Sequence, residues 1–151
     1  QIQSFLHAMH DKHELAAEKQ SMRNGTAGYI PMDCTELPYR KLIRRMNAAI
    51  IAILGHDAWG YTGLWSTRLP KGGYHVKHTH PAGWMSGICY IDVPSQESGH
   101  LHFEDRFIKP QTGDVVVFPS DTPHSVTVYE GDKPRLTVAF DLLRLEARMA
   151  A

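Results

Sequence analysis

After Gly55 the sequence becomes a succession of short β-prone segments, separated by clusters of Gly, Pro, Asp and Ser roughly every ten residues. Such spacing is typical of antiparallel sandwiches and barrels rather than of alternating strands and helices. The predicted strands are 61–69, 73–79, 84–93, 99–104, 114–118, 124–129 and 134–142. This pattern predicts a jelly roll that makes up most of the chain.

The residues before Gly55 have a different, helical pattern. Apolar residues at 2, 5, 6 and 9 indicate a moderately amphipathic helix from Gln1 to about Lys19, and residues 21–31 are expected to form a polar loop. A stronger helix is predicted at 39–54, with Thr35 or Asp33 able to cap its start and Gly55 at its end. We therefore predict a mainly β fold with N-terminal helices packed on one outer face of the jelly roll.

Composition favours a single domain with no charged partner. The chain has 151 residues, with sixteen basic and sixteen acidic side chains, so no nucleic acid or anionic membrane is expected as a partner. We divide it into a helical support region, 1–55, and a jelly-roll core, 56–145. Cys34 and Cys89 are too few for a disulfide framework, which predicts free thiols and a cytoplasmic location. Ten histidines are an excess that favours metal or proton chemistry.

Three of these histidines form a candidate metal site. His78 and His80 are two positions apart at the end of the predicted strand 73–79, so in extended backbone their side chains point to the same face. His124 follows a turn, a buried strand and Pro119, and would face back across a barrel toward the first pair. The alternative is that all three are ordinary surface histidines, but their combination favours one metal ion.

A second group of polar residues could bind a carboxylate. Arg135 and Thr137 share one face of the last strand, and an arginine offers a fixed, always-charged fork for an acid. Tyr90 and Ser86 likewise share a face of the strand that follows the histidine pair. The alternatives are an arginine at the rim with its head in water and a tyrosine packed in the sheet.

The remaining histidines are expected to be less informative. His100, His102 and Glu104 also have strand spacing, but the apolar residues between them occupy the other face, so this rival cluster is expected to face solvent. Five further histidines have no partner at ligand spacing and are expected at the surface or in packing: His7, His10, His13, His56 and His75.

Three stretches resemble the Fe(II)- and 2-oxoglutarate-dependent dioxygenases, and in particular bacterial 2-oxoglutarate oxygenase domains related to prolyl and aspartyl hydroxylases. They are GGYHVKHTHPAGWMSGICYIDVP, GDVVVFPSDTPHSV and PRLTVAFD, and residues 20–26 resemble an N-terminal motif of the same domains. The resemblance implies a double-stranded β-helix, a cupin-like variant of the jelly roll. It also implies that Fe(II), 2-oxoglutarate and O2 take part in the reaction.

Site residues are implied by the same resemblance. His78 would be the first iron ligand and His124 the distal one. Arg135 would bind the distal carboxylate of 2-oxoglutarate with help from Thr137, and Tyr90 matches a position where prolyl-hydroxylase-like relatives place a tyrosine on that carboxylate. Ser86 falls on the same face and is grouped with them.

The sequence departs from the family pattern at one ligand. The wider family reads His-x-Asp or His-x-Glu, and His80 stands where the carboxylate belongs. Three imidazoles could hold a divalent ion facially, or His80 could stay outside the coordination sphere and water complete a two-histidine site. Aspartyl hydroxylases, which resemble this region, lack the carboxylate too.

The resemblance predicts an oxidoreductase, a hydroxylase that couples oxidative decarboxylation of 2-oxoglutarate to oxidation of a second substrate. That substrate, a peptide side chain or a small molecule, is not specified by the sequence. An exposed face of the helix at 39–54 could mediate a homodimer. Two other readings stay open at this point. One is a cupin-type enzyme with a three-histidine metal site, and the other is a non-catalytic jelly-roll binding module.

Overall fold

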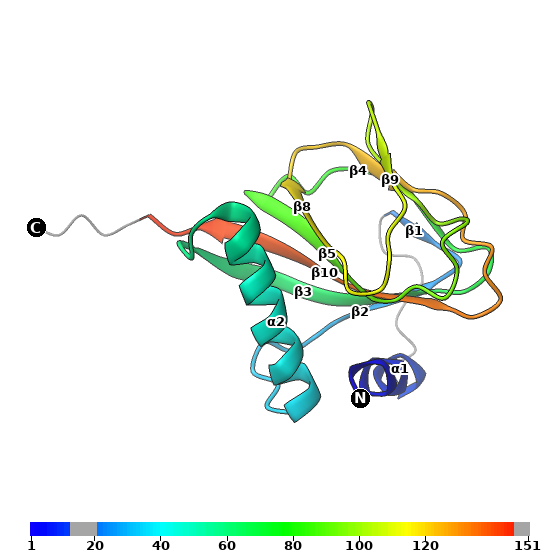
Figure 1. Ribbon diagram of the computed structural model, residues 1–151, viewed down its shortest axis with the longest axis horizontal. Coiled ribbons are helices and arrows are strands. Elements are labelled where there is room, and N and C mark those ends of the chain that lie inside the picture. The colour runs from blue at the N-terminus through cyan, green and yellow to red at the C-terminus, as the bar shows by residue number, and fades with distance from the viewer. Residues whose placement is uncertain (13–20, 147–151) are drawn as a thin grey trace, which may run out of the picture.

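The fold is built from two antiparallel sheets of five strands each, which face one another, and two helices (Figure 1). The computed structural model describes residues 1–12 and 21–146. One sheet has the strand order β1-β4-β9-β6-β7: Met22–Arg23, Tyr74–His78, His124–Val126, Leu101–His102 and Phe107–Ile108. The other has the order β2-β3-β10-β5-β8: Thr26–Tyr29, Trp59–Leu69, Arg135–Arg144, Met85–Asp92 and Val115–Pro119. The predicted jelly roll is thereby confirmed.

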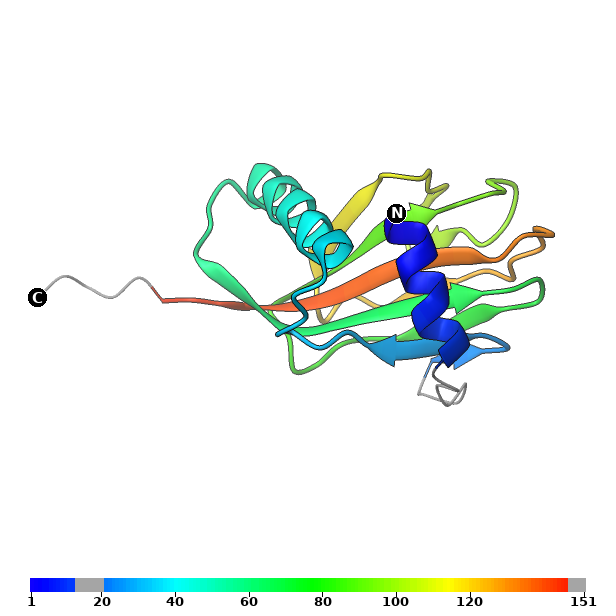
Figure 2. The same cartoon turned by 90° about the horizontal axis from the view of Figure 1, so that it is seen from below.

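Both helices cover the outer face of the β2-β3-β10-β5-β8 sheet, and the prediction that they pack on one outer face is confirmed (Figures 1 and 2). Helices α1 (Ile2–Lys12) and α2 (Leu37–Leu54) bury their apolar sides against the outward side chains of β10. The core between them contains these residues, among others: Leu6, Leu42, Met46, Ile50, Leu136, Val138 and Phe140. Within the described residues, no helix combines the length and apolarity needed to cross a bilayer.

The ends of the helices follow the sequence only in part. Gly55 ends α2 as predicted, because its positive φ of 79° lets its N–H donate to the carbonyl of Ile51. The predicted caps Thr35 and Asp33 are wrong, since α2 starts after Glu36, which makes no side-chain cap bond. Pro38 in the first turn lacks the N–H that a cap would satisfy. The sequence predicts that the first helix extends to Lys19, and the part of this prediction beyond Lys12 lies outside the described residues.

The expected polar loop at 21–31 is wrong, because this segment contributes one strand to each sheet. Strand β1 pairs with β4, placing Met22 opposite His75, and β2 pairs with β3. Asn24, with φ of 58°, makes the turn between them. These strands are stabilised by pairing with distant segments, so a local apolar pattern could not reveal them. The region 1–55 is therefore more than a helical support.

Alternation along β10 separates two environments. Leu136, Val138 and Phe140 face the helices, and Arg135 and Thr137 point into the space between the sheets. A second, smaller apolar cluster fills this interior at the Arg135 end: Met22, Leu69, Leu101, Val126 and Tyr129. The predicted strand 99–104 is present but shorter, as β6 (Leu101–His102), which forms a hairpin with β7 (Phe107–Ile108). The polar interior beyond this cluster contains the candidate site.

Candidate metal centre

His78 and His124 are brought together by strand pairing. They are direct partners across β4 and β9, and their ring centroids lie 4.2 Å apart. A register shift between His75 and His78 turns the end of β4, so that residues three apart share the inner side. Antiparallel partners project to the same face at short distance. The pairing therefore places two imidazoles side by side inside the jelly roll.

Backbone contacts leave the Nε2 atoms of these histidines available as ligands. Nδ1 of His78 lies 2.7 Å from the carbonyl of Val76, and Nδ1 of His124 lies 2.9 Å from that of Thr122. A carbonyl only accepts, so each Nδ1 carries the proton and donates. Each Nε2 then has a lone pair directed at the interior.

Burial keeps both imidazoles neutral. It lowers the pKa of His124 to about 4, against a weaker opposing effect of the bond to Thr122, and it also lowers the pKa of His78. Metal binding requires the unprotonated ring, so neither histidine has to release a proton near neutral pH. The environment thus prepares both rings for a cation.

His80 completes the group from a position just beyond the end of β4. The prediction that it shares a strand with His78 is inaccurate, because β4 ends at His78 and the chain turns. The backbone N–H of His80 donates to the carbonyl of Ser120, and its Nε2 lies 3.3 Å from Nε2 of His124. The ligand atoms of the three histidines all lie within 4.8 Å of one another.

This spacing suits facial coordination. Metal–imidazole bonds of roughly 2.1 Å at right angles would place two donor nitrogens about 3 Å apart, close to the separation between His80 and His124. Among the residues that the structure describes, these three histidines are the group of metal-binding type that is close enough to hold an ion. The donor set therefore fits a divalent metal.

Arg135 lies deep between the sheets. Its side chain is 3% exposed, so the rim position considered from the sequence does not occur. One terminal nitrogen donates to the carbonyl of Gly99, and the guanidinium carbon lies 5.6 Å from the centre of the Tyr90 ring. Among the described residues, Arg135 Nε and the Tyr90 hydroxyl are the fully buried side-chain polar atoms that lack a hydrogen-bond partner.

Buried polar atoms without partners are costly in a protein interior, and a bound ligand would relieve that cost. Burial raises the pKa of Tyr90 to about 12, although Arg135 opposes the change, so the phenol keeps its proton as a donor. Burial also lowers the pKa of Arg135 without discharging it. Two donors, one of them cationic, fit a carboxylate.

Thr137 and Ser86 lie on the same interior side. Thr137 is 5% exposed and lies opposite Tyr90 in the β10–β5 pairing. Ser86 is also buried, but its hydroxyl donates to Asp141 Oδ1 at 2.6 Å and contacts the Ser120 hydroxyl at 2.8 Å. Ser86 is thus placed near the histidines and is engaged by protein partners.

Sequence reasoning missed two aromatic neighbours of the histidines. His75, expected at the surface or in packing, stacks on His78 with centroids 6.2 Å apart, and burial lowers its pKa to about 3. Trp65 on β3 stacks on His80 at 5.8 Å. The spacing of three between His75 and His78 is no strand signal, and the bulge that aligns them is not readable from the sequence.

Other polar groups lie elsewhere. His100 and His102 stack on the half-exposed ring of Phe107, and Glu104 pairs with Lys77, so the rival cluster forms no metal site.

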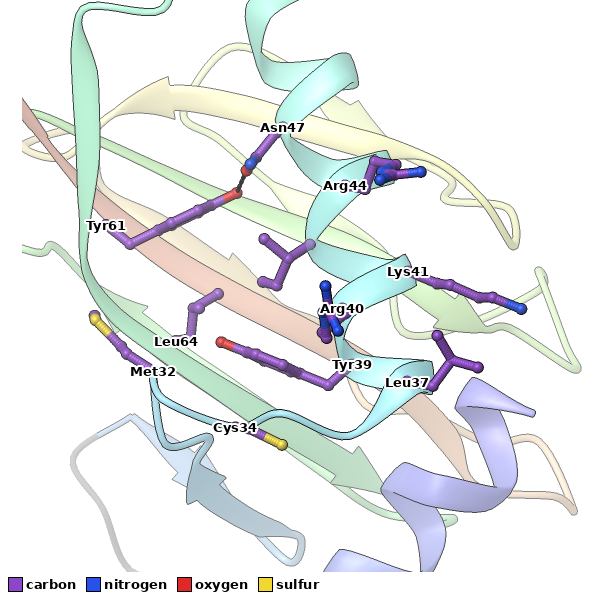
Figure 3. A pocket seen from close by; sticks show the side chains of 11 residues that line it. Met32, Cys34, Leu37, Tyr39, Arg40, Lys41, Arg44, Asn47, Tyr61 and Leu64 are labelled. Carbon is purple, nitrogen blue, oxygen red and sulfur yellow. Dashed lines mark hydrogen bonds between the residues drawn. The ribbon is translucent and has the colours of Figure 1, made fainter.

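A cavity of about 850 Å³ lies between α2 and β3, where Tyr39, Tyr61 and Arg44 line it (Figure 3). It is on the helix side of the sheet, away from the three histidines.

A comparison with protein families identifies the chain. The family model described as "Putative 2OG-Fe(II) oxygenase" matches residues 63–107 and 100–141, which together span more than half of the chain. These matches include every residue of the candidate site. The chain belongs to this family. It is an oxidoreductase whose reaction uses Fe(II), 2-oxoglutarate and O2.

Solved structures support the fold of the oxygenase. A prolyl-4-hydroxylase from Pseudomonas putida is 17% identical with a TM-score of 0.70, covering 95% of this chain and 84% of that one. A viral collagen prolyl hydroxylase from Paramecium bursaria Chlorella virus-1, solved with 2OG, is 15% identical with a TM-score of 0.66, covering 96% and 90%. A cupin-2 domain from Rhodospirillum rubrum is 14% identical with a TM-score of 0.51, covering 90% and 72%. A search of curated proteins found no match.

Proposed function

We propose that the oxygenase is a hydroxylase in which His78, His80 and His124 hold Fe(II). Arg135 and Tyr90 then bind the distal carboxylate of 2-oxoglutarate. The observation that carries the proposal is the pair of unpartnered buried donors, Arg135 Nε and the Tyr90 hydroxyl, in the same interior as the three converging histidines. A diacid that reaches from the metal to Arg135 would satisfy both donors at once.

Each residue has a physical task in this assignment. The bound iron, with 2-oxoglutarate and O2, supplies the oxidising chemistry. Arg135 neutralises and orients the distal carboxylate, and Tyr90 adds a directed hydrogen bond. Thr137, opposite Tyr90 across the strands, is positioned to contact the same group. Ser86 stays a prediction as a fourth contact, since its hydroxyl already donates to Asp141.

The second substrate is a peptide side chain or a small molecule. Two solved proteins of the same fold are named as prolyl hydroxylases, which makes a peptidyl proline the first substrate to test. We also propose a reducing, cytoplasmic environment, because Cys34 and Cys89 are both free thiols. The homodimer through α2 and the absence of nucleic-acid and membrane partners stay predictions.

Succinate release from 2-oxoglutarate, measured with Fe(II) and O2, tests the proposal. Arg135→Ala should raise the KM for 2-oxoglutarate at least about 30-fold, since removing one partner of a buried charge pair typically costs 2–5 kcal/mol. Iron binding should persist. Arg106→Ala is the matched control, because Arg106 is exposed and pairs with neighbouring Asp105.

Arg135→Lys separates charge from shape. It keeps the cation but loses the planar fork, so an intermediate KM is expected. Folding of each variant is checked by circular dichroism. Turnover in Arg135→Ala with an unchanged KM would contradict the role of Arg135, and no succinate from the intact iron-loaded protein would contradict the oxygenase mechanism as a whole.

A further inference from the structure

Asp141 lies behind His80, on the side of the ring opposite the candidate metal position. It belongs to the same inward face of β10 as Arg135 and Thr137. Its Oδ1 lies 3.6 Å from Nδ1 of His80, and Nε2 of His80 faces His124 at 3.3 Å. A distance of 3.6 Å allows electrostatic attraction and is too long for a hydrogen bond. The two nitrogens of His80 thus face a carboxylate and the metal position.

A buried hydroxyl network holds this carboxylate. Ser86 donates to Asp141 Oδ1 at 2.6 Å and therefore accepts from Ser120, whose hydroxyl lies 2.8 Å away. Both serines are 1% exposed. The carbonyl of Ser120 also accepts the backbone N–H of His80 at 2.8 Å. One network therefore fixes both the carboxylate and the backbone of the histidine that it faces.

Close packing at Gly83 keeps this network in place. A Cβ at Gly83 would lie 2.5 Å from the Ser120 hydroxyl and 3.7 Å from Cβ of Asp141. Glycine is therefore required for the loop after His80 to close over Ser120. The loop after His80, strand β5 that directly follows it, and the sequence-distant strand β10 meet at Asp141.

His80 differs from the other two histidines in its partner. His78 and His124 donate from Nδ1 to backbone carbonyls, which are neutral. His80 instead faces a carboxylate, and this is the histidine at the position where the family pattern has an acid. Through electrostatic attraction at 3.6 Å, the carboxylate favours the tautomer of His80 that carries its proton on Nδ1, which leaves the lone pair of Nε2 for the metal and strengthens it as a donor.

We infer that Asp141 is a positioning residue that acts through His80. It supplies the metal site with the negative charge that the family's carboxylate ligand would have supplied directly, but from behind the imidazole of His80. The inference rests on the proposed three-histidine site. Ser86 serves this arrangement by directing Asp141 toward His80. Direct coordination by Asp141 is the alternative that the experiment must separate.

Binding of Co(II) alone, followed by calorimetry on the metal-free protein without 2-oxoglutarate, tests the inference. Asp141→Asn keeps the shape and should weaken Co(II) binding about 10- to 100-fold, the usual effect of removing a partner of a ligand histidine. Asp132→Asn is the matched control, since Asp132 is 95% exposed and pairs with Lys71.

A double-mutant cycle with His80→Asp identifies the route of the effect. In this background the acid is a direct ligand, so Asp141→Asn should change Co(II) affinity by no more than about twofold, the scatter of independent sites. An equal loss in both backgrounds would mean that Asp141 ligates directly or acts on folding, and would overturn the inference. Unchanged affinity in Asp141→Asn alone would do the same.

Two further variants test the hydroxyl network and the metal site separately. Ser86→Ala leaves His80 and Asp141 intact but releases the carboxylate, so a smaller loss of Co(II) affinity in the same direction is expected, and no loss counts against the inference. His124→Ala should abolish binding. If it does not, the proposed metal site itself is wrong, whereas loss in His124→Ala without loss in Asp141→Asn overturns only the role of Asp141.

Discussion

The Nε2 atoms of His80 and His124 lie 3.3 Å apart, although 44 positions separate the two residues in the sequence. Two lone pairs at this distance repel unless a cation or a proton lies between them. The imidazole planes are nearly parallel, with an interplanar angle of 13°. The fold thus holds two bases at a separation that suits cis ligands of one ion.

Removal of a single ligand histidine should eliminate tight metal binding. His78→Ala deletes one of three imidazoles, so the affinity for Mn(II) or Fe(II) should fall at least about 100-fold, which calorimetry on the chelator-treated protein measures. His102→Ala, in the same sheet but stacked on Phe107, should leave metal binding unchanged. Equal losses in the two variants would refute the site.

The Tyr90 hydroxyl should have opposite effects on stability and on ligand binding. Because it is buried without a partner, Tyr90→Phe should stabilise the protein by about 1 kcal/mol in the absence of 2-oxoglutarate. The affinity for 2-oxoglutarate should fall about tenfold, since one charge-assisted hydrogen bond is lost. Denaturant unfolding and anaerobic titration measure the two effects.

Tyr129→Phe provides the comparison for Tyr90→Phe. The hydroxyl of Tyr129 donates to the carbonyl of Lys133 at 2.6 Å. Its removal should destabilise the protein by about 1 kcal/mol. The same sign for both variants would show that the Tyr90 hydroxyl has a partner in the protein.

His10 should make the stability of the protein depend on pH. It is 4% exposed, lies between the hydroxyls of Ser66 and Thr26, and has a pKa lowered to about 4, chiefly by burial and then by Arg68. Between pH 6.5 and 4 the unfolded chain binds more protons at this residue than the folded one. Stability should therefore fall with decreasing pH, by about 2–3 kcal/mol from this group.

His10→Gln isolates this contribution. The variant cannot titrate, so its free energy of unfolding should lose less than that of the wild type between pH 7 and pH 4.5. Denaturant melts at the two pH values measure the difference. Parallel losses in both proteins would exclude His10 as the source.

Gly87 should be irreplaceable for a steric reason. A Cβ at this position would lie 2.2 Å from the Phe140 ring and 2.6 Å from the carbonyl of Val116. Gly87→Ala should therefore reduce the free energy of unfolding by about 1–3 kcal/mol. Gly60→Ala, where a Cβ meets nothing within 4 Å, should change it by less than about 0.5 kcal/mol. Thermal melts compare the two.

Much of the candidate site could be predicted from local pattern. Alternation along β10 placed Arg135 and Thr137 on one face and Leu136 on the other, as observed. The same rule placed Tyr90 and Ser86 together on β5. The rule also predicted that His78 and His80 lie close together, but for an incomplete reason. His80 lies beyond the end of β4, and the hydrogen bond from its backbone N–H to the carbonyl of Ser120 holds it near His78.

Features that depend on pairing between distant segments were missed. The strands at 22–23 and 26–29 exist because β4 and β3 are there to receive them. His75 became a neighbour of His78 through a bulge, and Asp141 reached His80 only through the sheet register of β10 with β5. None of these relationships leaves a periodic signal in its own segment.

The sequence by itself determined the jelly roll, the direction of alternate side chains and the identity of the residues able to bind a metal and an acid, because strand alternation and side-chain chemistry are local properties. Tertiary structure alone decided that three imidazoles converge on one point, that Arg135 is sealed from water beside an unpartnered tyrosine, and that a carboxylate lies behind His80. Convergence requires the register between distant strands, and register is set by packing of the whole core.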